Sequence, residues 1–349
     1  MSNLNNNLDV MLKNAKGVMS GMKTLKSVED VDLAPSPREV VFQVGKVKLY
    51  HFKNENKKTK TPLLISYALV NTWKMMDLQD DRSLIKKLLD EGLDIYIMET
   101  GHPSRVDRYK NLDDYINGDI NDCVNFVCAE NNTDQVNLLG VCQGGTIGLM
   151  YTALYPEKIK NLTLLVTPID FSIEEGLLFK WSRDMDIDKL VDNFNGIVPG
   201  KFLDAGFQML KPMGMARKQM NLPKIMENEA GFINFLRMEK WINDCPDQAG
   251  EIYRQFIKDL YQDNKLIKGT MKIGDRFVDL SKVTCPLMNI YAKEDHLVPP
   301  TATKPLNDVV GSADKQLYEF PGGHIGVFVG ARSQKELGPS IAKFFADRD

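Results

Sequence analysis

Residues 138–146 read Leu-Leu-Gly-Val-Cys-Gln-Gly-Gly-Thr, a Gly-x-Cys-x-Gly turn between a strand-like apolar run and the helically spaced residues 146–154. A residue at the centre of such a sharp strand-to-helix turn has a strained backbone, and side chains two residues away on either side would collide. Gly140 and Gly144 remove those side chains. The turn would then expose the Cys142 thiol near the positive end of the following helix, which favours the thiolate.

This pattern is typical of the nucleophile elbow of the α/β hydrolase fold, with cysteine where serine usually stands. The short string also occurs by chance, and a merely structural turn is the alternative. The strand before it and the helix after it favour a nucleophilic Cys142. The remaining cysteines have no such context and are interpreted as small buried hydrophobes: Cys123, Cys128, Cys245 and Cys285.

Length and composition limit the class of protein. The 349 residues suffice for one large α/β domain with an insertion, and a formal charge of −3 without basic clusters gives no reason to expect nucleic-acid binding. No apolar run approaches the about 20 residues of a membrane helix, and the first residues do not resemble a signal peptide. An odd number of cysteines without paired spacing suggests a reducing cytoplasm. Four histidines without paired Cys/His spacing predict no metal site.

Strand-like and helix-like runs alternate along most of the chain and predict a mostly parallel sheet covered on both faces. We divide the chain into an N-terminal amphipathic segment and linker (1–37), a first part of an α/β hydrolase core (38–170), a cap insertion (171–283) and a second part of the core (284–349). The cap range is rich in Met, Phe, Lys and Asp and shows no clear strands. The expected core strands are 39–44, 46–53, 63–67, 94–98, 135–141, 162–166, 285–291 and 316–320, and the expected helices are 82–91, 112–130 and 334–346.

The N-terminal segment contains a candidate helix over residues 10–26. Its apolar residues follow the steps of four and three of a heptad seam, and they are Met11, Ala15, Val18, Met22 and Leu25. Gly17 and Gly21 weaken this helix. Two interpretations remain open: the stripe packs on the protein's own core, or it docks on a partner helix or an apolar surface.

A cysteine nucleophile needs a base, and the base needs an orienting group. In this fold the chain order is nucleophile, acid, histidine. Asp295 follows one expected strand in the sequence Glu-Asp-His-Leu-Val-Pro, and His324 follows the last one in Gly-Gly-His-Ile-Gly. Both loops fall at the carboxyl end of the sheet, beside the elbow. We therefore predict the triad Cys142, Asp295 and His324.

Other residues compete for these roles. Glu294 is an alternative acid, one residue nearer the strand. His296 would be the base only if the usual chain order were abandoned, and it is expected beside the triad rather than in it. His102 either lines the pocket or makes loop hydrogen bonds, and His51 is expected to be structural.

Acyl transfer also needs backbone N–H donors for the oxyanion. The amide of Gln143, directly after the nucleophile, is one candidate. The second is expected from the loop after the strand 63–67, where we select Val70 to within one residue.

At this point the sequence resembles the polyhydroxyalkanoate synthases. The resemblance is carried by Tyr-Ala-Leu-Val-Asn, Met-Asp-Leu-Gln-Asp-Asp-Arg-Ser-Leu, Gly-Val-Cys-Gln-Gly-Gly-Thr, Glu-Asp-His-Leu-Val-Pro and Gly-Gly-His-Ile-Gly, at 67–71, 76–84, 140–146, 294–299 and 322–326. The chain lacks the long N-terminal domain of the self-sufficient synthases and is similar to the short catalytic subunit of two-component types, class III more than class IV. One departure is Glu99-Thr100-Gly101, where the family usually has Asp-Trp-Gly.

The resemblance implies that Cys142 accepts a hydroxyacyl group from an (R)-3-hydroxyacyl-coenzyme A thioester and that His324 deprotonates the thiol. Asp295 would assist His324 or activate the hydroxyl of the next unit. Coenzyme A is then part of the substrate, and no separate cofactor is expected. The resemblance further implies a second synthase subunit, assembly as a homodimer or hetero-oligomer, and a cytoplasmic location at the surface of polyester granules.

Two other functions fit the same residues. An intracellular polyester depolymerase or thioesterase would use the same triad, with water instead of an alkyl hydroxyl reaching the acyl-enzyme. A non-catalytic granule scaffold on a hydrolase fold is the alternative of another class. The intact triad argues against it.

Overall fold

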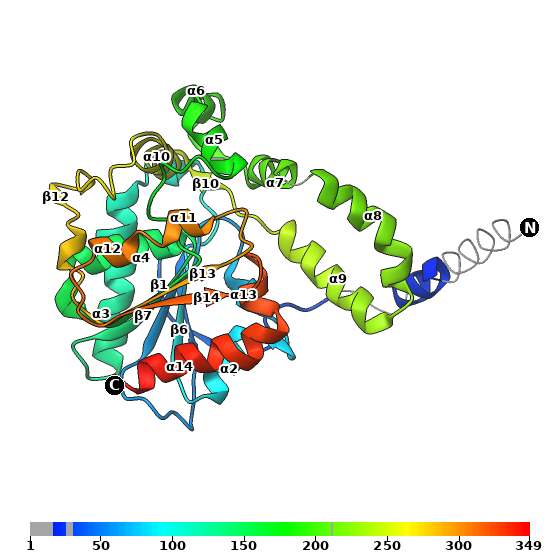
Figure 1. Ribbon diagram of the computed structural model, residues 1–349, viewed down its shortest axis with the longest axis horizontal. Helices are drawn as coiled ribbons and strands as arrows, with labels where there is room; N and C mark the ends of the chain where they lie inside the picture. Colours follow the sequence, from blue (N-terminus) through cyan, green and yellow to red (C-terminus); the bar gives the residue numbers. More distant parts are fainter. Residues whose placement is uncertain (1–16, 26–30, 211) are drawn as a thin grey trace, which may run out of the picture.

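The computed structural model describes residues 17–25, 31–210 and 212–349, and its centre is one eight-stranded sheet (Figure 1). The strand order is β1-β2-β6-β3-β7-β8-β13-β14. The strands are β1 (Glu39–Val44), β2 (Val47–Phe52), β3 (Leu63–Ser66), β6 (Ile95–Glu99), β7 (Val136–Val141), β8 (Ile159–Leu165), β13 (Leu287–Ala292) and β14 (Lys315–Phe320). The hairpin β1–β2 is antiparallel and joins β6 antiparallel, while all pairs from β6 to β14 are parallel. The predicted fold class is confirmed.

Both faces of the sheet are buried, because side chains of each strand alternate between two apolar layers. Leu64 and Leu138 lie in the layer under α3 (Asn121–Glu130) and α4 (Gln143–Leu154). Ile65 and Leu139 lie in the layer under α2 (Leu84–Asp90), α13 (Gly326–Val329) and α14 (Gly338–Ala346). Figure 1 shows these helix groups on opposite sides of the sheet. This packing holds the carboxyl ends of the parallel strands at one rim.

The expected helices differ from the observed ones at their N-terminal ends. The helix expected from 82 begins at Leu84, because Arg82–Ser83 (β5) pairs with Asp77–Gln79 (β4) and the Ser83 hydroxyl accepts from the Lys86 amide as an N-cap. The first turns of the helices expected at 112–130 and 334–346 are π-helical, over Asp114–Ile120 (η3) and Ser333–Leu337 (η7). Local periodicity detects a helix but does not fix its pitch.

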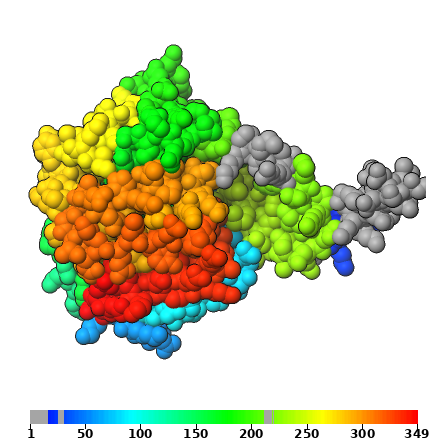
Figure 2. Space-filling view, viewed as in Figure 1, coloured from blue at the N-terminus to red at the C-terminus, as the bar shows by residue number. Residues whose placement is uncertain are grey.

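The chain between β8 and β13 is mainly helical. Its helices are α5 (Leu177–Asp184), α6 (Ile187–Asn193), α7 (Gly200–Met209), α8 (Pro212–Met226), α9 (Glu229–Ile242), α10 (Gly250–Gln255) and the π-helical η5 (Phe256–Gln262). Two two-residue ladders also occur, β9 (Ile197–Val198) with β10 (Gln248–Ala249) and β11 (Lys272–Ile273) with β12 (Arg276–Phe277). Figure 2 shows the α8–α9 hairpin projecting from the body, and Figure 1 shows residues 17–25 against its outer end.

The helix at 17–25 packs through its glycines and not through its apolar stripe. A methyl group at Gly17 would lie 2.1 Å from the Pro223 carbonyl oxygen of α8, so only glycine allows this approach. Val18, Met22 and Leu25 are 40%, 57% and 49% exposed. The interpretation that these three residues pack on the core is therefore wrong. The remaining stripe residues, Met11 and Ala15, lie outside the described residues.

Candidate active site

The predicted elbow has the expected backbone strain. Cys142 lies between β7 and α4 with φ +52° and ψ −123°, a conformation that non-glycine residues rarely adopt. A methyl group at Gly140 would lie 2.5 Å from the Gly145 Cα, and one at Gly144 would lie 2.3 Å from the Tyr67 carbonyl oxygen. Gly140 is therefore required by the turn itself, and Gly144 by the close approach of α4 to the loop after β3.

The structure brings Cys142, Asp295 and His324 together from three loops at the carboxyl end of the sheet. The Asp295 Oδ2 lies 2.6 Å from the His324 Nδ1, and the other carboxylate oxygen accepts from the Leu297 and Val298 amides at 2.9 Å each. Cys142 contributes to the electrostatic environment of His324, so its thiol faces the imidazole. Asp295 and His324 are both buried. The arrangement is a hydrogen-bonded carboxylate–imidazole pair beside the sulfur.

The electrostatic interactions around His324 favour a proton on its imidazole. Burial opposes the charged form of His324, but the Asp295 carboxylate and Cys142 outweigh burial and raise the pKa of His324 to about 10. An imidazolium next to the sulfur is the partner that stabilises a thiolate nucleophile.

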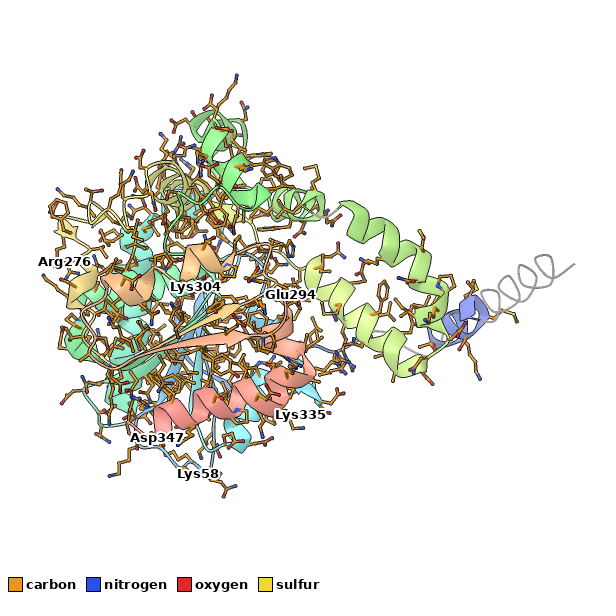
Figure 3. The ribbon with its side chains drawn as sticks, viewed as in Figure 1. Lys58, Arg276, Glu294, Lys304, Lys335 and Asp347 are labelled. Atoms are coloured by element: carbon orange, nitrogen blue, oxygen red, sulfur yellow. The ribbon has the colours of Figure 1, made fainter. Side chains whose placement is uncertain are left out.

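The competing residues are not part of the Asp295–His324 pair. Glu294, labelled in Figure 3, is exposed and lines a cavity of about 380 Å³ together with Asp295, His296 and Leu177 of α5. His102 lines a second, smaller cavity. His51 lies on β2, next to the edge strand β1, and its Nε2 is 2.8 Å from the Asp94 carboxylate.

The other cysteines are poor nucleophiles. Burial raises the pKa of Cys123, Cys245 and Cys285 to about 12, and it also raises the pKa of Cys128. A thiol with so high a pKa stays protonated at neutral pH and is neither an effective nucleophile nor a metal ligand.

The two candidate oxyanion donors lie on segments that contact each other. Gln143 is the first residue of α4, and its side-chain Oε1 accepts from the Leu69 amide at 3.1 Å. Within the part of the chain that the structure describes, the next amide, that of Val70, makes no hydrogen bond. Asn71 follows with φ +60°. The sequence analysis missed the Gln143 side chain as the link between elbow and loop, because a glutamine carries no signal of its partner.

Aromatic residues around the sulfur were also missed. Tyr67 and the cap residue Tyr261 are buried, and burial, followed by the neighbouring Cys142, raises the pKa of both phenols. Phe328 packs edge-on near the His324 ring, with a centroid distance of 6.4 Å. These rings give the reaction centre an apolar wall. The only sequence signal was the position of Tyr67 in a quoted motif.

The Glu99-Thr100-Gly101 departure lies close to this site. The Glu99 Oε2 accepts from the Trp73 indole at 2.8 Å, and residues 99–101 line the smaller cavity together with the loop after β3. The difference between Glu99-Thr100-Gly101 and the usual family motif therefore alters the wall of the smaller cavity.

No cluster of three metal-ligating side chains occurs among the residues that the structure describes. None of the helices in those ranges is long and apolar enough to cross a membrane.

A cysteine elbow beside a buried Asp–His pair at the carboxyl end of a parallel sheet defines a candidate site of the α/β hydrolase fold. The sequence profile of the α/β hydrolase fold matches residues 61–331. Solved structures with this fold include a serine hydrolase of Cycloclasticus zankles (TM-score 0.54, 13% identity, 88% of this chain and 97% of that one) and a monoacylglycerol lipase of Paleococcus ferrophilus (TM-score 0.53, 12% identity, 87% of this chain and 100% of that one).

Closer relatives define the family. The poly(3-hydroxyalkanoate) polymerase subunit PhaC of Thiocystis violacea is 46% identical over 341 residues, which cover 97% of this chain and 96% of the relative. The protein of the same name from Allochromatium vinosum is 44% identical over 342 residues, again 97% and 96%. The chain belongs to the poly(3-hydroxyalkanoate) polymerase subunit family.

Proposed function

We propose that this chain is the catalytic subunit of a polyhydroxyalkanoate synthase, an acyltransferase that polymerises (R)-3-hydroxyacyl-coenzyme A thioesters and releases coenzyme A. The observation that carries the proposal is the buried, hydrogen-bonded Asp295–His324 pair beside the strained Cys142 elbow. The near full-length relatives named as polymerase subunits support it. Coenzyme A is part of the substrate, and the mechanism needs no further cofactor.

In the first half-reaction the Cys142 thiolate attacks the thioester carbonyl. A bond forms between this sulfur and the acyl carbon, the bond to the coenzyme A sulfur breaks, and the leaving thiolate takes a proton from His324. The Gln143 and Val70 amides are the proposed donors to the oxyanion. Exchange of one thioester for another is nearly balanced in free energy, so the acyl-enzyme stays reactive.

In the second half-reaction the hydroxyl of a hydroxyacyl unit attacks this acyl-enzyme. Its oxygen forms an ester with the acyl carbon, the bond to the Cys142 sulfur breaks, and His324 accepts the hydroxyl proton. Both oxygens of Asp295 are already engaged, one by two backbone amides and one by His324. This engagement supports an orienting role for Asp295 over direct activation of the hydroxyl.

The test follows the acyl group and coenzyme A separately. Purified protein is mixed with labelled hydroxybutyryl-coenzyme A, and polymer, free acid and released coenzyme A are measured. Polymer supports the synthase, free acid in equal amount to coenzyme A supports a thioesterase or depolymerase, and no release contradicts any acyl-transfer function. Cys142→Ala should retain no label, while the matched control Cys128→Ala should behave as wild type.

We also propose a second subunit, as in class III synthases, that docks on the exposed stripe of the N-terminal helix. The relatives are named as subunits, and Val18, Met22 and Leu25 face solvent while Gly17 and Gly21 attach the helix to α8. Met22→Gln should weaken activation by the second subunit without changing the intrinsic acylation rate. Full activation of this variant would contradict the docking site. Retained activation with loss of binding to polyester granules would assign the stripe to the granule surface instead.

A further inference from the structure

The loop after β3, which carries the proposed oxyanion donor Val70, is held on its outer side by the C-terminal end of α9. The Trp241 indole Nε1 donates to the Thr72 carbonyl at 2.7 Å, and the Lys74 ammonium pairs with Asp244 at 2.9 Å. The Asn71 side-chain amide lies 3.5 Å from the Trp241 carbonyl. Figure 1 shows α9 running back from the tip of the hairpin to the body. The C-terminal end of α9 is therefore attached to the loop that carries Val70 by three polar contacts.

The same loop is held from inside by the elbow helix, through the Leu69 amide and the Gln143 side chain. Val70 lies between these two anchors, one residue after Leu69 and two residues before Thr72. Its amide makes no hydrogen bond within the described ranges. The direction in which this N–H points is therefore set by the anchors on either side of it, and the outer anchor is the Trp241 indole.

Trp241 is seated firmly enough for this role. Its side chain is 7% exposed, and it lies in the last turn of α9. About one turn earlier on the same helix, Arg237 donates to the Asp32 carbonyl at 3.0 Å and to the Gln79 side chain at 3.1 Å. These contacts fix α9 against the body. A phenylalanine would keep an aromatic ring at this position, although a smaller one, but it could not donate to Thr72.

We propose that Trp241 is a positioning residue for acylation: its indole N–H, by holding the Thr72 carbonyl, aims the Val70 amide at the oxyanion that forms on attack by Cys142. This inference rests on the proposed acyl transfer. Loss of a direct oxyanion donor lowers kcat by about 100- to 1,000-fold in hydrolases. Loosening one of two anchors of such a donor should lower the acylation rate less, by about 10-fold.

The test compares two reactions of the same sulfur. Acylation by hydroxybutyryl-coenzyme A passes through an oxyanion, whereas alkylation by iodoacetamide displaces iodide at a saturated carbon and forms none. Trp241→Phe should slow single-turnover acylation at saturating substrate by about 10-fold and leave the alkylation rate of Cys142, followed by peptide mass spectrometry, unchanged. The matched control is Trp181→Phe, because Trp181 is a partly exposed tryptophan on the cap helix α5. It should change neither rate.

The outcomes separate this inference from the function on which it rests. If wild-type protein is not acylated, the proposed function fails. If wild type is acylated and Trp241→Phe matches it, the positioning role is overturned. If acylation and alkylation fall together in Trp241→Phe, Trp241 supports the triad or the fold in general, and the positioning role is again overturned. Asp244→Asn, which removes the partly exposed pair with Lys74, provides a second variant and should slow acylation only, by about two-fold.

Discussion

Replacing Gly144 by alanine should both destabilise the protein and disable the site. The new methyl carbon would lie 2.3 Å from the Tyr67 carbonyl oxygen and 2.5 Å from the Ser66 carbonyl oxygen, far inside van der Waals contact. Both obstacles are backbone atoms, which cannot rotate away, so we take the upper part of the range for overpacking, about 3 kcal/mol. Alanine regains about 0.4–1 kcal/mol through the unfolded chain. The net destabilisation is about 2 kcal/mol.

For a chain of 349 residues this free energy corresponds to a fall of roughly 3 °C in the thermal midpoint. The added methyl also separates α4 from the loop after β3, so the contact between Gln143 and Leu69 loosens. A displacement near 1 Å costs about 100-fold in rate when it misaligns reacting groups. Thermal unfolding followed by circular dichroism and single-turnover acylation measure the two effects.

The matched control is Gly206→Ala in the helix α7, where an added methyl group meets nothing within 4 Å. This variant should raise the thermal midpoint slightly, by up to about 1 °C, and acylate normally. The reasoning is refuted if Gly144→Ala melts no lower than wild type and acylates at the wild-type rate. A loss of stability without a loss of acylation would refute only the functional half.

Three further predictions concern other parts of the molecule. His324→Gln should abolish acylation, and Asp295→Asn should also slow acylation if Asp295 orients the imidazole; acylation without chain elongation in Asp295→Asn would show instead that it activates the hydroxyl. Burial raises the pKa of Asp94, but the hydrogen bond and charge of its histidine partner outweigh burial and lower the net value. The stability lost in Asp94→Asn should therefore be full at pH 6, begin to shrink near the ordinary carboxyl pKa of 3.8 and disappear only below the lowered pKa of the folded state, in paired melting curves; a deficit independent of pH would contradict this. Gly17→Val should detach the N-terminal helix from α8 and speed its proteolysis, whereas Met22→Gln should not; equal digestion patterns would refute glycine-mediated packing.

Much of the fold followed from local sequence. Alternating apolar strands and amphipathic helices gave the parallel core, because each element must bury its own apolar face. The spacing of Gly140 and Gly144 around Cys142 predicted a strained elbow, and the backbone there has the positive φ that such a turn requires. Chain order and loop position selected Asp295 and His324, since parallel strands bring their carboxyl ends to one rim whatever their distance in sequence.

The partners across the site could not be found in this way. Nothing local shows that the Gln143 side chain meets Leu69 or that Trp241 reaches back 169 residues to Thr72. Such contacts join single side chains to backbone atoms, which every residue carries, so the sequence holds no signal of the pairing. The Trp241 contact exists only because α9 packs against the loop after β3 at the rim of the sheet.

The N-terminal helix shows most directly which properties follow from local sequence and which depend on tertiary packing. Its sequence determined that the segment is helical and amphipathic, because both properties depend on neighbours within one or two turns. Which face packs inward depended on the surface opposite. The α8 helix offers a backbone carbonyl at Pro223 and a methionine side chain at Met226, so the glycine face approaches closely and the apolar stripe is left facing solvent. Local sequence decides what an element is, and the shape of its tertiary neighbour decides which face of it is buried.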